Sequence, residues 1–128
     1  MMKKRLFSLF ALSLALLLML ASCAPAYKGD ARVGSYIAYG ADGKTVVYRL
    51  TLGENGTGEI IHYPTIGGET REEIIFEFRD ESINLHGTEV VGGVVGRGEL
   101  WGEVALVGSA YTFELRSQGG VLANFVSE

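Results

Sequence analysis

Residues 41–63, ADGKTVVYRLTLGENGTGEIIHY, decide the fold of this 128-residue chain. Side chains at positions 45–52 alternate with the two-residue period of a β-strand, and four apolar residues share one face: Val46, Tyr48, Leu50 and Leu52. Asp42-Gly43 and Asn55-Gly56 flank this strand, and such dipeptides supply the positive φ angles that tight hairpin turns need. The pattern predicts an antiparallel meander of three strands at about residues 34–40, 45–52 and 58–63.

The rest of the chain continues as short apolar segments separated by turn residues. Further strands are predicted at residues 72–79, 82–86, 89–98, 99–107, 110–116 and 121–126. Eight or nine short antiparallel strands would leave two sheet edges exposed unless the sheet closes on itself. We therefore predict an all-β protein in which a meander of about eight strands closes into an up-and-down barrel, with a β-sandwich as the alternative.

The N-terminus has the three zones of a secretory signal peptide. Lys3, Lys4 and Arg5 form a positive patch, residues 6–21 are uncharged and mostly apolar, and Leu20-Ala21-Ser22-Cys23 follows. The apolar run is shorter than the roughly 20 residues of a spanning helix. Leu-Ala-Ser-Cys resembles the bacterial lipobox, which implies cleavage after Ser22 and attachment of diacylglyceryl and fatty acyl chains such as palmitate to Cys23.

The expected domains are a removed signal peptide at 1–22, a lipidated tether at 23–32 and a single β-barrel domain at 33–128. Cleavage removes three of the 11 basic residues and leaves 8 against 15 acidic ones, a formal charge of −7. Such a charge argues against nucleic acid and anionic headgroups as partners, because both require basic patches. Cys23 is the single cysteine, so no disulfide forms within the domain.

Residues that could carry out catalysis or bind a metal are few and scattered. His62 and His86 are far apart in sequence and have no Cys or carboxylate cluster at metal-ligand spacing. Glu73 and Glu77 would share the outer, solvated face of one strand rather than occupy the two distinct environments that acid–base catalysis requires. We therefore predict a protein that is not an enzyme and uses no metal or cofactor. Trp101 is the single tryptophan, a candidate partner contact or, alternatively, a cap on the barrel core.

The lipobox, Gly34-Ser35-Tyr36, Asp42-Gly43, Leu50-Thr51-Leu52 and Asn55-Gly56-Thr57-Gly58 together resemble the start of small lipocalin-like lipoproteins of the Bacteroidetes group. The resemblance implies a short lipocalin-like (calycin-type) barrel anchored in the bacterial cell envelope. Ala24 after the cysteine implies, by likeness to Gram-negative lipoproteins, sorting to the outer membrane on its periplasmic side.

Two functions are compatible with such a barrel. The first is a binding protein that holds a small apolar ligand inside, for which the glycines at positions 92–102 leave room. The second is a protein-interaction module, such as an inhibitor or an accessory subunit of an envelope complex. An eight-stranded barrel can be filled by its own side chains, and the aromatic residues at 36, 48, 76, 78, 111 and 113 could fill this one.

Overall fold

The computed structural model describes residues 26–87 and 99–128, which contain β-strands and no helix. The predicted signal peptide at 1–22, the predicted lipid-attachment residue Cys23 and the whole of the predicted strand at 89–98 lie outside these ranges. The strands are β1 Gly34–Tyr39, β2 Val46–Leu52, β3 Thr57–His62, β4 Thr70–Arg79, β5 Ser82–Gly87, β6 Leu100–Glu103, β7 Ala105–Val107, β8 Ala110–Ser117 and β9 Gly120–Ser127. All their pairings are antiparallel, as the meander predicts.

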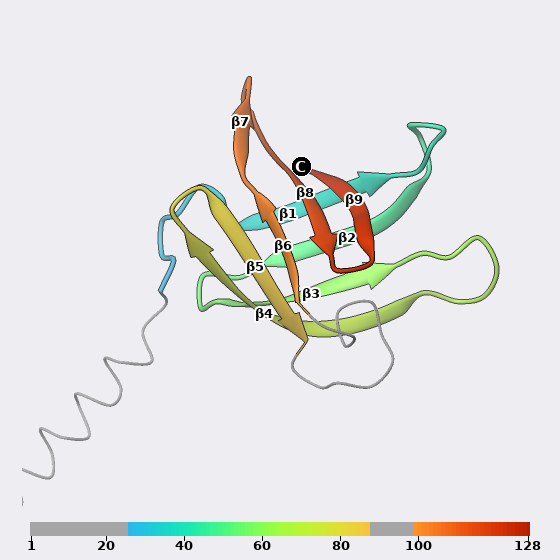
Figure 1. Cartoon of the computed structure of the whole chain (residues 1–128), viewed down its shortest axis with the longest axis horizontal. Coiled ribbons are helices and arrows are strands. Elements are labelled where there is room, and N and C mark those ends of the chain that lie inside the picture. The colour runs from blue at the N-terminus through green and yellow to red at the C-terminus, as the bar shows by residue number, and fades with distance from the viewer. Residues whose placement is uncertain (1–25, 88–98) are drawn as a thin grey trace, which may run out of the picture.

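The strands form one sheet that closes into an eight-stranded barrel with one additional strand (Figure 1). The order in the sheet is β6-β5-β4-β3-β2-β1-β9-β8-β7, and a further pairing of β6 with β8 joins the two ends. Trp101 of β6 lies opposite Arg116 of β8 at this seam. The barrel prediction is confirmed, and the sandwich alternative is wrong because one continuous sheet closes on itself.

The predicted hairpins are present where the turn dipeptides place them. Gly43 and Gly56 have φ angles of 68° and 83°, a region that glycine enters without steric cost. The expected strand at 99–107 is split, since Val104 separates β6 from β7 and donates its backbone N–H to the Glu81 carbonyl oxygen at 2.5 Å. Beyond this break β7 pairs with β8 alone in the described part of the chain.

Apolar side chains from the inner faces of the strands fill the barrel. The cluster of buried residues comprises Tyr36, Ala38, Leu50, Leu52, Ile60, Ile74, Phe76, Ile83, Leu85, Leu100, Phe113, Leu115 and Phe125. Phe113 stacks on Phe125 with ring centroids 5.6 Å apart and tilts against Tyr36 at 4.8 Å. Burial raises the pKa of Tyr36 to about 12, so its hydroxyl stays neutral and donates a hydrogen bond of 2.5 Å to the Arg32 carbonyl oxygen.

Gly102 permits the seam to close. A Cβ atom at this position would collide with the carbonyl oxygen of Glu114 on β8 and come within 3.6 Å of the Leu115 side chain. The sequence suggested that the glycines at 92–102 leave room inside the barrel. At Gly102 the missing side chain instead allows the β6 and β8 backbones to approach each other closely.

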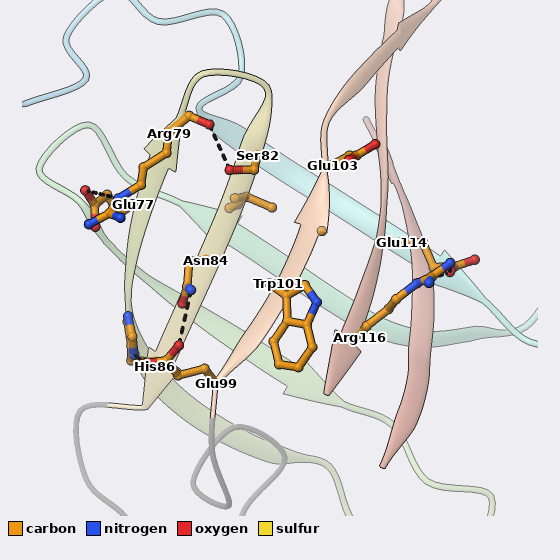
Figure 2. A pocket seen from close by; sticks show the side chains of 12 residues that line it. Glu77, Arg79, Ser82, Asn84, His86, Glu99, Trp101, Glu103, Glu114 and Arg116 are labelled. Carbon is orange, nitrogen blue, oxygen red and sulfur yellow. Dashed lines mark hydrogen bonds and ion pairs between the residues drawn. The ribbon is translucent and has the colours of Figure 1, made fainter. Parts of the chain in front are cut away.

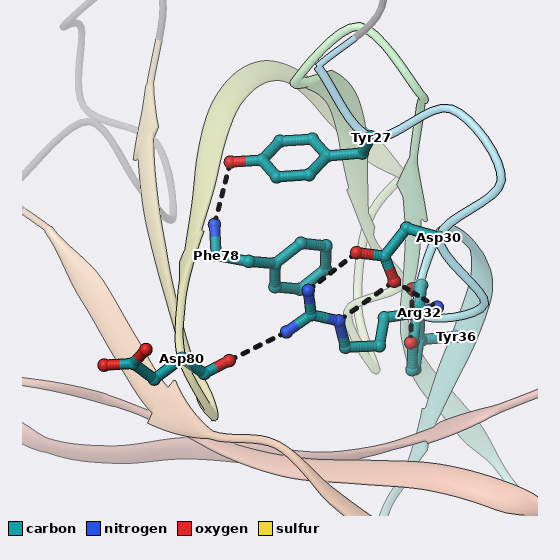
Figure 3. A network of polar contacts seen from close by, with 6 residues as sticks. All are labelled: Tyr27, Asp30, Arg32, Tyr36, Phe78 and Asp80. Atoms are coloured by element: carbon teal, nitrogen blue, oxygen red, sulfur yellow. Dashed lines mark hydrogen bonds and ion pairs between the residues drawn. The ribbon is translucent and has the colours of Figure 1, made fainter.

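Residues 26–32, which the sequence placed in the tether, pack across one end of the barrel (Figure 3). Tyr27 donates its N–H to the Glu54 carbonyl oxygen at 2.8 Å, and its hydroxyl accepts the Phe78 N–H at 3.0 Å. Arg32 forms a two-pronged ion pair with Asp30 at 2.6 and 3.0 Å, and it donates to the Asp80 carbonyl oxygen at 2.9 Å. This segment links the β2–β3 turn to the β4–β5 turn.

The Asp30–Arg32 pair makes stability depend on pH. Hydrogen bonds from the Arg32 side chain hold the pKa of Asp30 below its ordinary value of 3.8. Because the lowered pKa belongs to the folded state, the stabilisation is present above 3.8 and is lost as pH falls through the folded-state pKa. Asp30→Asn should therefore cost more stability at about pH 6 than at about pH 2.5 in urea unfolding. An equal cost at both values would contradict this assignment.

Candidate binding site

A cleft of about 840 Å³ crosses the outer wall of the barrel over four strands, β4, β5, β6 and β8 (Figure 2). Its volume lies in the range of small-molecule sites, about 300–1,000 Å³. The described residues that line it are Glu77, Arg79, Ser82, Ile83, Asn84, His86, Glu99, Trp101, Gly102, Glu103, Glu114 and Arg116. Glu99 directly precedes β6, and the others, apart from Ile83 and Gly102, occupy outward positions of the alternating strands.

Strand register arranges the cleft side chains in rows. Glu77 pairs with Asn84, Asn84 pairs with Trp101, and Trp101 pairs with Arg116. This central row runs from β4 to β8 across the seam, so it exists only because the barrel closes. A second row begins with the pair of Arg79 and Ser82 and continues with the pair of Ser82 and Glu103.

Trp101 stands at the centre of the cleft on the outside of the barrel, with 41% of its surface exposed. Its neighbours in β6, Leu100 and Gly102, are buried, because adjacent strand residues point to opposite faces. The alternative in which Trp101 caps the barrel core is therefore wrong. An indole that remains open to solvent among polar side chains offers a flat apolar contact to a ligand.

Most charges in the cleft are already paired with one another. Arg79 bonds Glu77 at 3.1 Å, and Arg116 bonds Glu114 at 2.5 Å within the same strand. Glu99 lies 3.3 Å from Nδ1 of His86. Glu103 is the remaining carboxylate, and it has no ion pair among the described residues.

Asn84 carries an unsatisfied acceptor beneath the cleft. Its Nδ2 donates to Glu99 at 3.3 Å, whereas its Oδ1 is shielded and has no hydrogen-bond partner in the described part of the chain. Rotating the amide by half a turn would bring Oδ1 against the Glu99 carboxylate, so the observed orientation is the favourable one. An unpaired buried acceptor costs about 1–3 kcal/mol, which a donor from outside the protein could recover.

The other residues considered from the sequence do not form a site together. His62 stacks on Tyr48 with ring centroids 4.8 Å apart, two strands away from His86. Glu73 and Glu77 both lie on the outer face of β4, as predicted. No three His, Cys, Asp or Glu side chains gather as a metal site within residues 26–87 and 99–128. Those ranges also contain no helix long and apolar enough to cross a membrane.

Comparison with known proteins finds a similarity in fold alone. No family model matches it, and no curated protein matches it. A crystal structure of an uncharacterized protein from Bacteroides eggerthii is similar with a TM-score of 0.51 and 13% identity. The match covers 75% of this chain and 98% of that one. The likeness is one of fold. It supports the barrel fold and carries no activity with it.

Sequence reasoning singled out Trp101 and missed its partners Asn84 and Arg116. The pairing of Glu77 with Asn84 in the central row could have been predicted. A two-residue turn at Asp80-Glu81 places Arg79 opposite Ser82, and the antiparallel register then places Glu77 opposite Asn84. The other half depends on which residue of β8 meets β6 at the seam. No local pattern specifies that register.

Proposed function

We propose that this protein is a membrane-anchored, non-enzymatic binding lipoprotein of the bacterial envelope that takes its ligand in the outer cleft. The observation that supports this proposal most strongly is that Trp101 is exposed at the centre of a cleft. The interior of the barrel, by contrast, is occupied by the protein's own side chains. Flat aromatic residues at the centre of a contact surface commonly carry most of the binding energy.

The interior is the less favoured ligand site. An eight-stranded barrel has room either for its own side chains or for one small ligand, and here Tyr36, Phe76, Phe113 and Phe125 contribute aromatic rings to the buried cluster. A small apolar ligand, the first function that the sequence suggested, would have to displace these rings. The outer cleft requires no such rearrangement.

Anchoring through Cys23 would hold the barrel close to the membrane. Tyr27, which packs on the barrel end, follows Cys23 by four residues, and an extended chain spans at most about 3.3–3.6 Å per residue. The barrel end that carries the β2–β3 and β4–β5 turns would thus lie within about 14 Å of the lipidated residue. The cleft lies on the side wall, where a ligand of the periplasm could reach it.

Cys23→Ala, made behind a signal peptide with an ordinary cleavage site so that the apolar run at 6–21 is removed, should move the protein from the membrane to the soluble fraction of the cell. Two or more acyl chains give stable membrane attachment, whereas the variant would retain none. Cell fractionation and the mass of the purified protein measure both effects. A wild-type protein that is soluble and carries no added mass would refute the anchoring.

Binding in the cleft is tested with the full-length chain in lipid nanodiscs and an envelope extract of the source bacterium. Trp101→Ala should abolish retention of the bound component, while Tyr39→Ala should not. Tyr39 is a matched control, because it is also an exposed aromatic residue, at 49%, but lies outside the cleft. A component retained equally by both variants would place the binding elsewhere.

A further inference from the structure

We infer that the ligand of the outer cleft is a neutral carbohydrate chain, with one sugar ring stacked on the indole of Trp101. This inference rests on the proposed function and adds the chemical class of the ligand. It follows from three properties of the cleft: an exposed aromatic face, charges that are paired internally, and an acceptor that has no donor.

The surroundings of Trp101 suit a ligand that is apolar on one face and polar around its edge. The indole is the single large apolar surface exposed among the cleft residues, and polar side chains flank it on both neighbouring strands, Asn84 on β5 and Arg116 on β8. A pyranose ring presents C–H groups on its face and hydroxyl groups at its rim. Figure 2 shows Asn84 on one side of Trp101 and Arg116 on the other, with the Arg116 guanidinium turned towards Glu114. The rim of a sugar stacked on Trp101 would therefore face the Asn84 amide on one side and the Arg116–Glu114 pair on the other.

The charge of the cleft disfavours anionic ligands. Four glutamates and two arginines give a formal charge of −2 with His86 neutral, so phosphate groups, nucleic acid and anionic headgroups would be repelled. Both arginines are held by glutamates of their own strands, Arg79 by Glu77 and Arg116 by Glu114. For a basic peptide, Glu103 is the one cleft carboxylate that has no ion pair among the described residues. A neutral ligand disturbs none of these pairs.

Asn84 indicates that the ligand is a hydrogen-bond donor. The Oδ1 atom lacks a partner while Nδ2 is engaged by Glu99. A sugar hydroxyl can donate its proton to an amide oxygen. Because Oδ1 is shielded, the amide would have to turn towards the cleft to accept from such a hydroxyl, whereas an apolar ligand would leave the acceptor unpaired.

The test uses the full-length chain in lipid nanodiscs, since many detergents carry sugar headgroups. The probes are hexasaccharides of glucose, mannose, xylose and N-acetylglucosamine, with a lysine hexapeptide as the ionic comparison. Trp101 is the single tryptophan of the chain, so its fluorescence reports on the cleft directly. We expect saturable binding of at least one hexasaccharide with a change in Trp101 emission, and a loss of at least about thirtyfold in affinity in Trp101→Ala by calorimetry.

Asn84→Ala separates a binding role from a structural one. We expect weaker hexasaccharide binding with an unchanged or raised melting temperature, because the variant removes an unsatisfied buried acceptor. Absence of hexasaccharide binding, or binding that is equal in wild type and Trp101→Ala, would overturn the carbohydrate inference. If the lysine peptide or an extract component alone binds and depends on Trp101, the proposed cleft function stands and the ligand class is wrong. If no binding of any kind depends on Trp101, the proposed cleft function and the carbohydrate inference are both wrong.

Discussion

Gly102→Ala should destabilise the protein by about 3 kcal/mol, near the upper end of the usual cost of overpacking. The added Cβ would collide with the Glu114 carbonyl oxygen, and a backbone atom cannot rotate away as a side chain can. Relief of the collision requires β6 and β8 to separate, which opens the seam of the barrel. Urea unfolding measures the loss of stability, and hydrogen exchange of β6 and β8 amides shows whether the seam is the part that opens.

Gly68→Ala is the matched control for this substitution. A Cβ at Gly68 meets nothing within 4 Å, and the residue has no positive φ angle. It should leave stability unchanged or raise it by a few tenths of a kcal/mol, because alanine restricts the unfolded chain. Equal stabilities of the two variants would show that β6 and β8 do not approach as closely as the structure has them.

Phe125→Ala should lower the stability by about 3–5 kcal/mol, the usual cost of removing a buried phenylalanine. The ring is completely buried and packs between Phe113 at 5.6 Å and Tyr48 at 6.1 Å. For a domain of this size, 3 kcal/mol corresponds to a decrease of roughly 12 °C or more in Tm. The substitution also leaves an apolar cavity, and such cavities bind benzene.

Benzene should therefore raise the Tm of Phe125→Ala and leave that of the wild type unchanged. Val126→Ala is the control, since Val126 is the next residue of β9 but faces outward and is 38% exposed. Its effect should stay within about 0.5 kcal/mol. A wild-type protein that gains stability from benzene would have an open interior, which would revive the apolar-ligand hypothesis.

The barrel was predictable from sequence because its signals are local. Turn dipeptides such as Asp42-Gly43 and Asn55-Gly56 define hairpins, and the alternation in β4 assigns Ile74 and Phe76 to the inside. The number of such hairpins, and the need to protect sheet edges, then favours a closed barrel. Each of these inferences uses residues that are neighbours in sequence.

The cleft was only partly predictable because it depends on contacts distant in sequence. Trp101 and Arg116 meet only after β9 has returned beside β1 and β8 has reached β6. Gly102 is one of 18 glycines, and nothing in its neighbours distinguishes a close backbone approach from a bend. The packing of Tyr27 on Phe76, at 5.3 Å, likewise follows from the position of the barrel end and from no local pattern.

The central claim, that the ligand occupies the outer cleft around Trp101, is tested most directly by the emission of this single tryptophan. The full-length protein in nanodiscs would be titrated with the envelope component that it retains. The account predicts a saturable change in Trp101 emission at the same concentrations at which calorimetry detects binding. Tight binding with unaltered emission, preserved in Trp101→Ala, would contradict the account and place the ligand away from the cleft.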